Sequence, residues 1–325
     1  MPPYTFTEDD LQTAFNHLDD TLFSKIRHMG STGHPEPRML IVAGAQGSGK
    51  THLLDHELLP SGRYASYIPL YLPAFRELHP QYAEMLEHGP LHAYEHTEAF
   101  IWALGGRVFE HAFAGRYNII METALDDPQF ADFPPAAVAA GYVFEVHLIA
   151  CQKEFGHWST LHRAVKSVAN NQLERFVPLS RIEASQANAK AILDAFEEAC
   201  TKTSGSEITL YRRGFDNDRN RAVLCHSKCV TPLELTPQPD YRGEGFVTGA
   251  FNRSVHIDRT PTRNAPCSYP QYSEVVHAGM IEAHTRRAMV NACCETLSQA
   301  QKIDTKVPRD TFRELCMYVL KYVHA

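Results

Sequence analysis

An eight-residue segment near the N-terminus has the residue types that bind a phosphate chain. It matches the pattern G-x-x-x-x-G-K-[ST] over Gly44 to Thr51. Its glycines let the backbone fold into a nest of N–H groups around a phosphate, Lys50 reaches the β- and γ-phosphate oxygens, and Thr51 offers its hydroxyl to Mg²⁺. The segment predicts binding of ATP or GTP together with magnesium. The predicted cofactor-binding residues are Gly44, Gln46, Gly47, Ser48, Gly49, Lys50 and Thr51.

The segments on either side of this loop favour the same interpretation. The apolar run Met39 to Ala43 comes directly before the loop and predicts a buried strand, and Thr51 to Leu59 predicts a helix after it. A chance glycine-rich turn would lack this strand and helix. The pattern alone still leaves motors, GTPases and small-molecule kinases open, because all of them use the same phosphate loop.

Helical and extended segments alternate over the first two thirds of the chain. Residues 7–28 predict an amphipathic helix that begins with a capping box between Thr7 and Asp10. Further helices are expected at residues 92–114, 158–169 and 182–200, and strands near 67–71, 117–121, 142–150 and 207–211. Strands separated by helices predict a three-layer α/β P-loop core with a mostly parallel sheet, and 207–211 is expected to be its last strand.

The remaining sequence has a different composition. Residues after 214 are rich in Pro, Arg, Asn and Tyr, and helices are expected near 272–300 and 309–323. We therefore expect a kinase-like domain at 1–214 and a mainly helical or irregular C-terminal extension at 215–325. Arg212 and Arg213, next to this boundary, could line a substrate or partner site but more readily indicate a solvated surface.

Charge and hydropathy exclude several classes of protein. The formal net charge of -7 disfavours binding to long nucleic acids. The first residues form no signal peptide, and no apolar run is long enough to span a bilayer. Eight cysteines scattered along the chain suit a reducing compartment. These features predict a cytoplasmic protein, although a non-classical signal for injection into a host cell would not be visible in them.

A set of motifs from about Tyr4 to Gly214 resembles the zeta toxin family of P-loop kinases. In chain order the motifs are YTFTEDDLQTAFNHL, GAQGSGKT, FRELHP, YNIIMET, GYVFEVHLIA, Arg163, RIEASQANA and LYRRG. The resemblance implies an ATP-dependent kinase that phosphorylates a hydroxyl of a nucleotide-linked metabolite, either a UDP-N-acetyl sugar or NAD. It also implies a role as a toxin or effector, with an antitoxin or chaperone protein as partner.

The resemblance also implies catalytic residues. Lys50 would hold the nucleotide, and Glu122 would match the acidic residue that follows the third strand. Arg163 and Arg181 would match two arginines that clamp the transferring phosphoryl group, with Arg175 as a competitor for Arg181. Arginines suit this role because the transition state spreads negative charge over the γ-phosphoryl group.

One position departs from the family pattern. The family places an aspartate two residues before the phenylalanine of the FR..HP motif, as the base that takes the proton of the attacking hydroxyl. Pro73 stands there in this chain, and Tyr71 occupies the other position that is often acidic. Glu77, Asp127 or His79 could replace this base, with His79 more readily structural, or a slow reaction could proceed without a dedicated base.

Three functions remain open at this stage. The first is the metabolite kinase, with Lys50, Glu122, Arg163, Arg181 and Glu77 as its predicted catalytic residues. The second is a catalytically silent relative that binds nucleotide and acts through protein–protein contacts. The third is a kinase of housekeeping metabolism or of nucleic-acid ends, which the acidic net charge disfavours in its nucleic-acid form.

Overall fold

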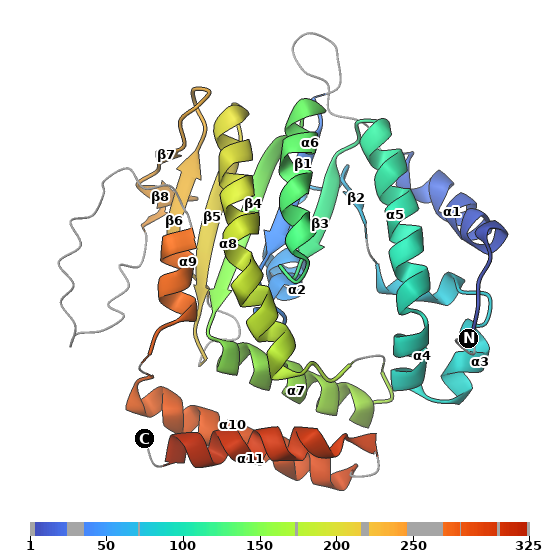
Figure 1. Cartoon of the computed structure of the whole chain (residues 1–325), viewed down its shortest axis with the longest axis vertical. Helices are drawn as coiled ribbons and strands as arrows, with labels where there is room; N and C mark the ends of the chain where they lie inside the picture. Colours follow the sequence, from blue (N-terminus) through green and yellow to red (C-terminus); the bar gives the residue numbers. More distant parts are fainter. Residues whose placement is uncertain are drawn as a thin grey trace.

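A mixed β-sheet forms the centre of the protein. The computed structural model describes residues 4–24, 36–70, 72–172, 175–215, 221–245, 269–279, 281–303 and 306–323. The sheet has the strand order β2-β3-β1-β4-β5-β6-β7 (Figure 1). Strands β1 to β5 are parallel to one another, β6 is antiparallel to β5, and β7 is antiparallel to β6. Its strands are β1 (Arg38–Ala43), β2 (Ile68–Pro69), β3 (Ile119–Thr123), β4 (Val143–Cys151), β5 (Glu207–Arg213), β6 (Arg221–Lys228) and β7 (Thr236–Pro237).

Strand β1 is buried on both faces. Met39, Ile41 and Ala43 belong to one hydrophobic cluster, whereas Leu40 and Val42 belong to another. All five side chains are fully buried. Burial on both faces is typical of a parallel strand with helices above and below the sheet. The expected central strand is therefore confirmed.

Helices cover the sheet on two sides. Helices α5, α6, α8 and α9 lie over one face, and α2 lies on the opposite face (Figure 1). The expected three-layer α/β core with a mostly parallel sheet is confirmed. None of the described helices is both long enough and apolar enough to cross a membrane. The α-helices are α1 (Glu8–Leu22), α2 (Lys50–Leu53), α3 (Tyr82–Glu87), α4 (Pro90–His96), α5 (Glu98–Ala114), α6 (Phe133–Ala139), α7 (Lys153–Ala169), α8 (Leu179–Lys202), α9 (Tyr269–Val276), α10 (Ala283–Lys302) and α11 (Arg309–Val323).

Helix α1 begins as the sequence predicts. Thr7 and Asp10 form the capping box, in which each side chain accepts a hydrogen bond from the backbone N–H of the other residue. The helix is fixed to α5 by Arg107, which pairs with Glu8 and donates to Gln12 Oε1 at 2.7 Å. The helix ends at Leu22, so its predicted continuation is wrong at residues 23 and 24, and residues 25–28 lie outside the described residues.

The sheet continues past the expected end. Strand β6 pairs with β5 over its whole length and β7 pairs with β6, so the prediction that residues 207–211 form the last strand is wrong. The pattern of β6 hides it, because five of its eight positions are only partly buried and an antiparallel strand near the sheet edge needs less burial than a central parallel strand. The division into domains at residue 214 stays a prediction.

The C-terminal helices pack against the core. The expected helix near 272–300 is two helices, α9 and α10, and α9 packs on α8 and β4. Helices α10 and α11 form an antiparallel pair outside α7 (Figure 1). Their contact with α7 contains a cluster that includes Phe155, Leu161, Met289, Leu315 and Tyr318.

Candidate active site

The phosphate loop joins β1 to α2 and is closely surrounded. Gly47 and Gly49 have φ angles of 74° and 87°, which favour glycine. A Cβ atom on Gly47 would lie 2.1 Å from the carbonyl oxygen of Gly156 in α7. A Cβ atom on Gly49 would lie 2.6 Å from Nη2 of Arg221. The backbone conformation therefore favours glycine at both positions, and at Gly47 the adjacent backbone of α7 also leaves no space for a side chain.

The helix after the loop is less regular than predicted. The segment is α-helical at Lys50–Leu53, continues as a π-helical turn at Leu54–Leu58 and ends as a 3₁₀ turn at Leu59–Ser61. Leu53 and Leu58 lie five residues apart and are both fully buried. The i→i+5 spacing of the π turn suits that pair of buried positions.

Lys50 lies at the centre of the charged groups around the loop. Its ammonium donates to the carbonyl oxygens of Gly44 at 2.7 Å and Ala45 at 3.2 Å. Burial lowers the pKa of Lys50 to about 8, and the cations of Arg163 and Arg175 act in the same direction. The carboxylates of Glu122 and Asp126 oppose this shift. The structure thus gathers two carboxylates and two guanidinium groups around one lysine.

Thr51 and Glu122 are adjacent, as their predicted roles require. Thr51 Oγ1 donates a hydrogen bond of 3.0 Å to Glu122 Oε2, because β1 and β3 are neighbours in the sheet. Burial raises the pKa of Glu122, while Lys50 and the Thr51 hydroxyl lower it. Glu122 lies near the carboxyl end of β3, and Thr51 begins the helix that follows the loop at the carboxyl end of β1, where ligands bind in open α/β sheets.

The loop fits a polyphosphate. The buried Ser48 Oγ has no hydrogen-bond partner among the described residues, and the lysine and the helix N-terminus both favour negative charge. In the described parts of the chain, no three His, Cys, Asp or Glu side chains are grouped to hold a metal ion. Bound together with a nucleotide, magnesium would contact Thr51 Oγ1, nucleotide phosphates and water.

The three candidate arginines lie in different surroundings. Arg163 is exposed on α7, and its charge acts on Lys50 and Glu122. Arg175 also acts on Lys50, and it pairs with Glu98 at 3.0 Å. Arg181 lies in the first turn of α8, with Nε 3.9 Å from Oδ2 of Asp126. The predicted roles of all three remain predictions.

The candidate bases also lie in different surroundings. Glu77 is exposed, and within the described part of the chain it makes no hydrogen bond or ion pair. Asp127 caps the 3₁₀ turn Pro128–Asp132 by accepting from the Gln129 N–H. His79 is buried between Phe6 and Phe100 and accepts from the backbone of Gln81, which suits a structural role. Pro73 is the first residue of the 3₁₀ helix Pro73–Leu78, and Tyr71 lies outside the described residues.

Two arginines beyond the loop were not predicted to belong to the site. Arg213 is buried, and it donates to the Gly47 carbonyl and, at 2.8 Å, to Ser159 Oγ. Its expected place on a solvated surface is therefore wrong, because it fills the space between the loop and α7. Arg221 of β6 donates to the Gly49 carbonyl at 2.9 Å and pairs with Glu57 at 3.0 Å. Since the N–H groups of a phosphate loop face the ligand, cations that bind its carbonyls stabilise this orientation.

Asp126 is a further residue that was not predicted. Gln46 Nε2 donates to Asp126 Oδ2 at 3.2 Å, and Ser185 Oγ donates to Gln46 Oε1 at 2.8 Å. The amide of Gln46 thus links the loop to the segment after β3 and to α8. The sequence offered one signal, since Asp126 follows a predicted parallel strand by a few residues.

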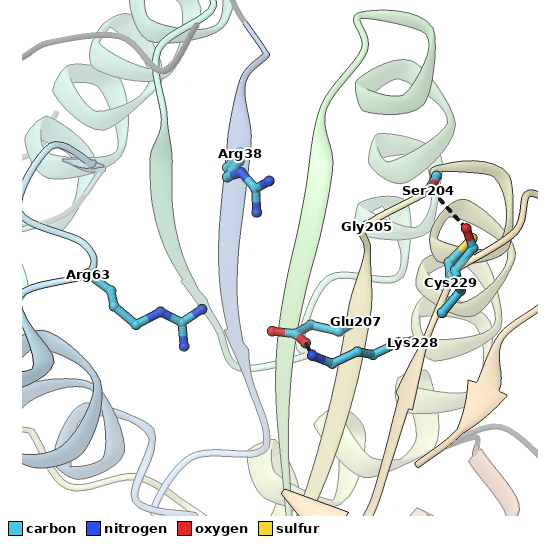
Figure 2. A pocket seen from close by; sticks show the side chains of 8 residues that line it. Arg38, Arg63, Ser204, Gly205, Glu207, Lys228 and Cys229 are labelled. Atoms are coloured by element: carbon cyan, nitrogen blue, oxygen red, sulfur yellow. Dashed lines mark hydrogen bonds and ion pairs between the residues drawn. The ribbon is translucent and has the colours of Figure 1, made fainter. Parts of the chain in front are cut away.

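A separate pocket lies at the other end of β1. Its volume is about 400 Å³, and Arg38, Arg63, Glu207 and Lys228 are among the residues that line it (Figure 2). Lys228 pairs with Glu207 at 3.1 Å. Arg38 begins β1 whereas the phosphate loop follows its last residue, so roughly 20 Å of strand separates the two. None of the predicted site residues lines this pocket.

The fold and the loop define a class of protein. A central parallel strand that leads through a glycine loop into a helix, with lysine and threonine where the loop meets the helix, is the arrangement of P-loop kinases and NTPases. The family model of the zeta toxins matches residues 20–228. The chain belongs to the zeta toxin family, whose members are kinase-like toxins, and the expected family is confirmed.

Two solved structures resemble the chain, and the first of them has a TM-score high enough to indicate the same fold. A structure from the PezAT chromosomal toxin–antitoxin system of Streptococcus pneumoniae is 20% identical, with a TM-score of 0.51 over 68% of this chain and 83% of that chain. The AvrRxo1-ORF1:-ORF2 complex with ATP is 10% identical, with a TM-score of 0.48 over 96% of this chain and 86% of that chain. No curated protein sequence matches the chain.

Proposed function

We propose that this protein is an ATP-dependent kinase that transfers the γ-phosphoryl group to a hydroxyl of a nucleotide-linked metabolite, either a UDP-N-acetyl sugar or NAD. The observation that supports this most is the set of charges around Lys50, with Glu122 and Asp126 opposing Arg163 and Arg175. Such a set suits a reaction that depends mainly on positioning and charge stabilisation.

The residues around the loop have different roles in the proposed reaction. The backbone N–H groups of the loop and Lys50 bind the β- and γ-phosphates, and Arg163 and Arg175 stabilise the charge of the transferring group. Thr51 binds magnesium, and Glu122 orients the Thr51 hydroxyl through their hydrogen bond. Magnesium, when bound, neutralises the phosphate oxygens.

A transfer assay tests this function. The purified protein is incubated with γ-labelled ATP and a panel of UDP-sugars and NAD, and label in the metabolite is measured. We expect transfer to one of them, and we expect Lys50→Ala to abolish it. Lys190→Ala, on an exposed lysine of α8 that pairs with Asp194, is the matched control and should transfer normally. Absence of transfer to every metabolite would refute the proposal.

A second candidate function rests on Pro73. Because a proline replaces the carboxylate of the family at this position, a protein that binds nucleotide without turnover is the alternative. Calorimetry separates the two functions. Tight ATP binding without any label transfer would support the silent relative, whereas transfer would exclude it.

We extend the proposal to the biological role. The family is one of toxins, and the structure from Streptococcus pneumoniae belongs to a toxin–antitoxin system. The protein would act in the cytoplasm of the cell that it harms, and an antitoxin or chaperone protein would restrain it. Expression should arrest growth, and expression of Lys50→Ala should not. Normal growth with the unaltered protein in several hosts would contradict this role.

A further inference from the structure

Pro73, at the position where the family has its catalytic aspartate, follows a strand whose neighbour in the sheet leads to another aspartate. Strand β2 leads to Pro73, and the adjacent parallel strand β3 leads to Asp126. The side chains that follow both strands therefore emerge at the same edge. Proline has no group that accepts a proton, whereas Asp126 has a carboxylate at this edge.

An unusual backbone conformation places Asp126. Leu125 has a φ angle of 61° although it is not glycine, and its side chain is fully buried. A left-handed conformation is unfavourable for leucine, so surrounding contacts must maintain it. Thr123 Oγ1 accepts from the Leu125 N–H at 3.1 Å, and Asn188 donates to the Asp126 carbonyl at 3.1 Å. This turn brings the Asp126 side chain to the phosphate loop.

The two carboxylate oxygens of Asp126 differ in their contacts. Oδ2 accepts from Gln46 Nε2 at 3.2 Å and lies 3.9 Å from Arg181 Nε. Oδ1 has no hydrogen-bond partner in the described part of the chain. The side chain is 33% exposed, so a bound substrate can reach it. One oxygen holds the carboxylate in place, and the other is left to accept a proton.

The other carboxylates of the region are less suitable. Glu122 accepts the hydrogen bond of Thr51, the residue proposed to bind magnesium, and Asp127 caps the 3₁₀ turn. Glu77 is exposed without a partner among the described side chains. Asp126 combines a fixed position, contact with the loop, and a charge that acts on Lys50.

We propose that Asp126 is the general base that replaces the carboxylate absent at Pro73. This inference rests on the proposed kinase function. As the acceptor oxygen bonds to the γ-phosphorus, its proton passes to Asp126 Oδ1. The bond between the γ-phosphorus and the oxygen that bridges to the β-phosphate breaks, and its electron pair stays on ADP. Asp126 then releases the proton to water.

The test compares two full-length variants with matched changes. Asp126→Asn keeps the oxygen that accepts from Gln46 but removes the base. We expect it to lower kcat for the metabolite labelled in the transfer assay by about 100-fold or more, with ATP affinity within about twofold of the wild type. Asp132→Asn, on an exposed residue without a side-chain cap interaction, should leave kcat unchanged.

The pH profile separates catalysis from a structural role. The charged groups around Asp126 are Lys50 and Arg181, and Glu122, Arg163 and Arg175 surround Lys50. We expect kcat of the wild type to fall in acid and the remaining rate of Asp126→Asn to lose that fall. If Asp126→Asn keeps the kcat of the wild type, or if its kcat still falls in acid as the wild-type value does, the role of Asp126 is wrong but the kinase proposal stands. Absence of transfer by the wild type would overturn both proposals.

Discussion

Glu98 is bound by two arginines that reach it from different elements. Its Oε2 lies 3.1 Å from Arg76 Nη2, and its Oε1 lies 3.0 Å from Arg175 Nη1. Arg76 is buried and also donates to Thr97 Oγ1 at 2.6 Å, so the carboxylate is held firmly. Both guanidinium groups approach the Tyr94 ring, at 3.9 Å for Arg76 and 5.5 Å for Arg175. Because these contacts already order Arg175, it loses less side-chain entropy on binding a phosphoryl group than an arginine without such contacts would.

This ordering predicts which arginine matters more for transfer. Arg175→Gln should lower kcat by about 100-fold, the typical cost of removing one donor to a transition-state oxyanion. Arg181→Gln should cost about tenfold or less, because Arg181 is half exposed and its one described ion pair is long, at 3.9 Å. Steady-state kinetics with the labelled metabolite measures both values. A larger loss at Arg181 would assign the clamp to Arg181 instead.

Some site residues could be predicted from the sequence, and others could not. Lys50, Thr51 and Glu122 follow apolar strands within local motifs, so their place at the sheet edge follows from the pattern. Asp126 depends on the left-handed conformation of Leu125, and nothing about a leucine indicates that conformation. The role of Arg221 depends on a carbonyl 172 residues away, which no local pattern can show.

At the scale of elements, α7 connects the loop to the C-terminal helices. Gly156 packs against Gly47 on one side of the helix. The next residue of α7, His157, has its Nδ1 2.6 Å from the hydroxyl of Tyr318 in α11. Burial lowers the pKa of His157 to about 4, so the neutral ring is the stable form in the folded protein.

The low pKa of His157 predicts a loss of stability in acid. The unfolded chain binds a proton at this histidine below about pH 6.5, whereas the folded chain does so below about 4, so the free energy of unfolding falls as the pH falls through this window. The loss should reach about 3 kcal/mol, and His157→Gln should remove it.

Denaturant titrations at several pH values measure this loss. His284→Gln, on an exposed histidine of α10, is the control and should retain the full acid loss. If His157→Gln loses as much stability in acid as the wild type, the prediction is wrong.

The sequence predicts the central strands of the sheet better than the strands at its β6–β7 edge. Strands β1 and β4 are buried apolar runs, and such runs identify central strands. Strand β6, with the sequence RAVLCHSK, is partly buried at five of its eight positions and lacks this signal. Strand β2 lies within the strand expected near residues 67–71, but it is only two residues long. The burial pattern therefore identified the centre of the sheet and the β2 edge, whereas the opposite edge at β6 and β7 depends on pairing between segments that the pattern does not mark.

At the scale of the whole molecule, residues before and after 214 build one site. Strand β6 pairs with β5 from Glu207 to Arg213, and Arg221 of β6 reaches the phosphate loop. Tyr241, from the small hairpin of β8 (Asp240–Tyr241) and β9 (Glu244–Gly245), packs in the same cluster as Leu40. We therefore expect the kinase unit to extend beyond residue 214.

Truncation tests this expectation. A chain that ends after Gly214 should bind ATP at least tenfold more weakly and should aggregate, because it exposes one edge of β5 and loses Arg221. Calorimetry and size-exclusion chromatography measure the two effects. Full-length Arg221→Met should weaken ATP binding without aggregation. Normal ATP binding by the truncated chain would instead support a domain boundary at residue 214.

The contacts of Arg213 and Arg221 have a consequence for protein synthesis. The phosphate loop leaves the ribosome early, but the arginines that bind its carbonyls follow 166 and 172 residues later. Since domains generally fold during synthesis from the N-terminal side, the loop lacks both contacts until β5 and β6 have emerged. We therefore expect a nascent chain that has not yet emerged as far as β6 to bind ATP more weakly than the complete chain.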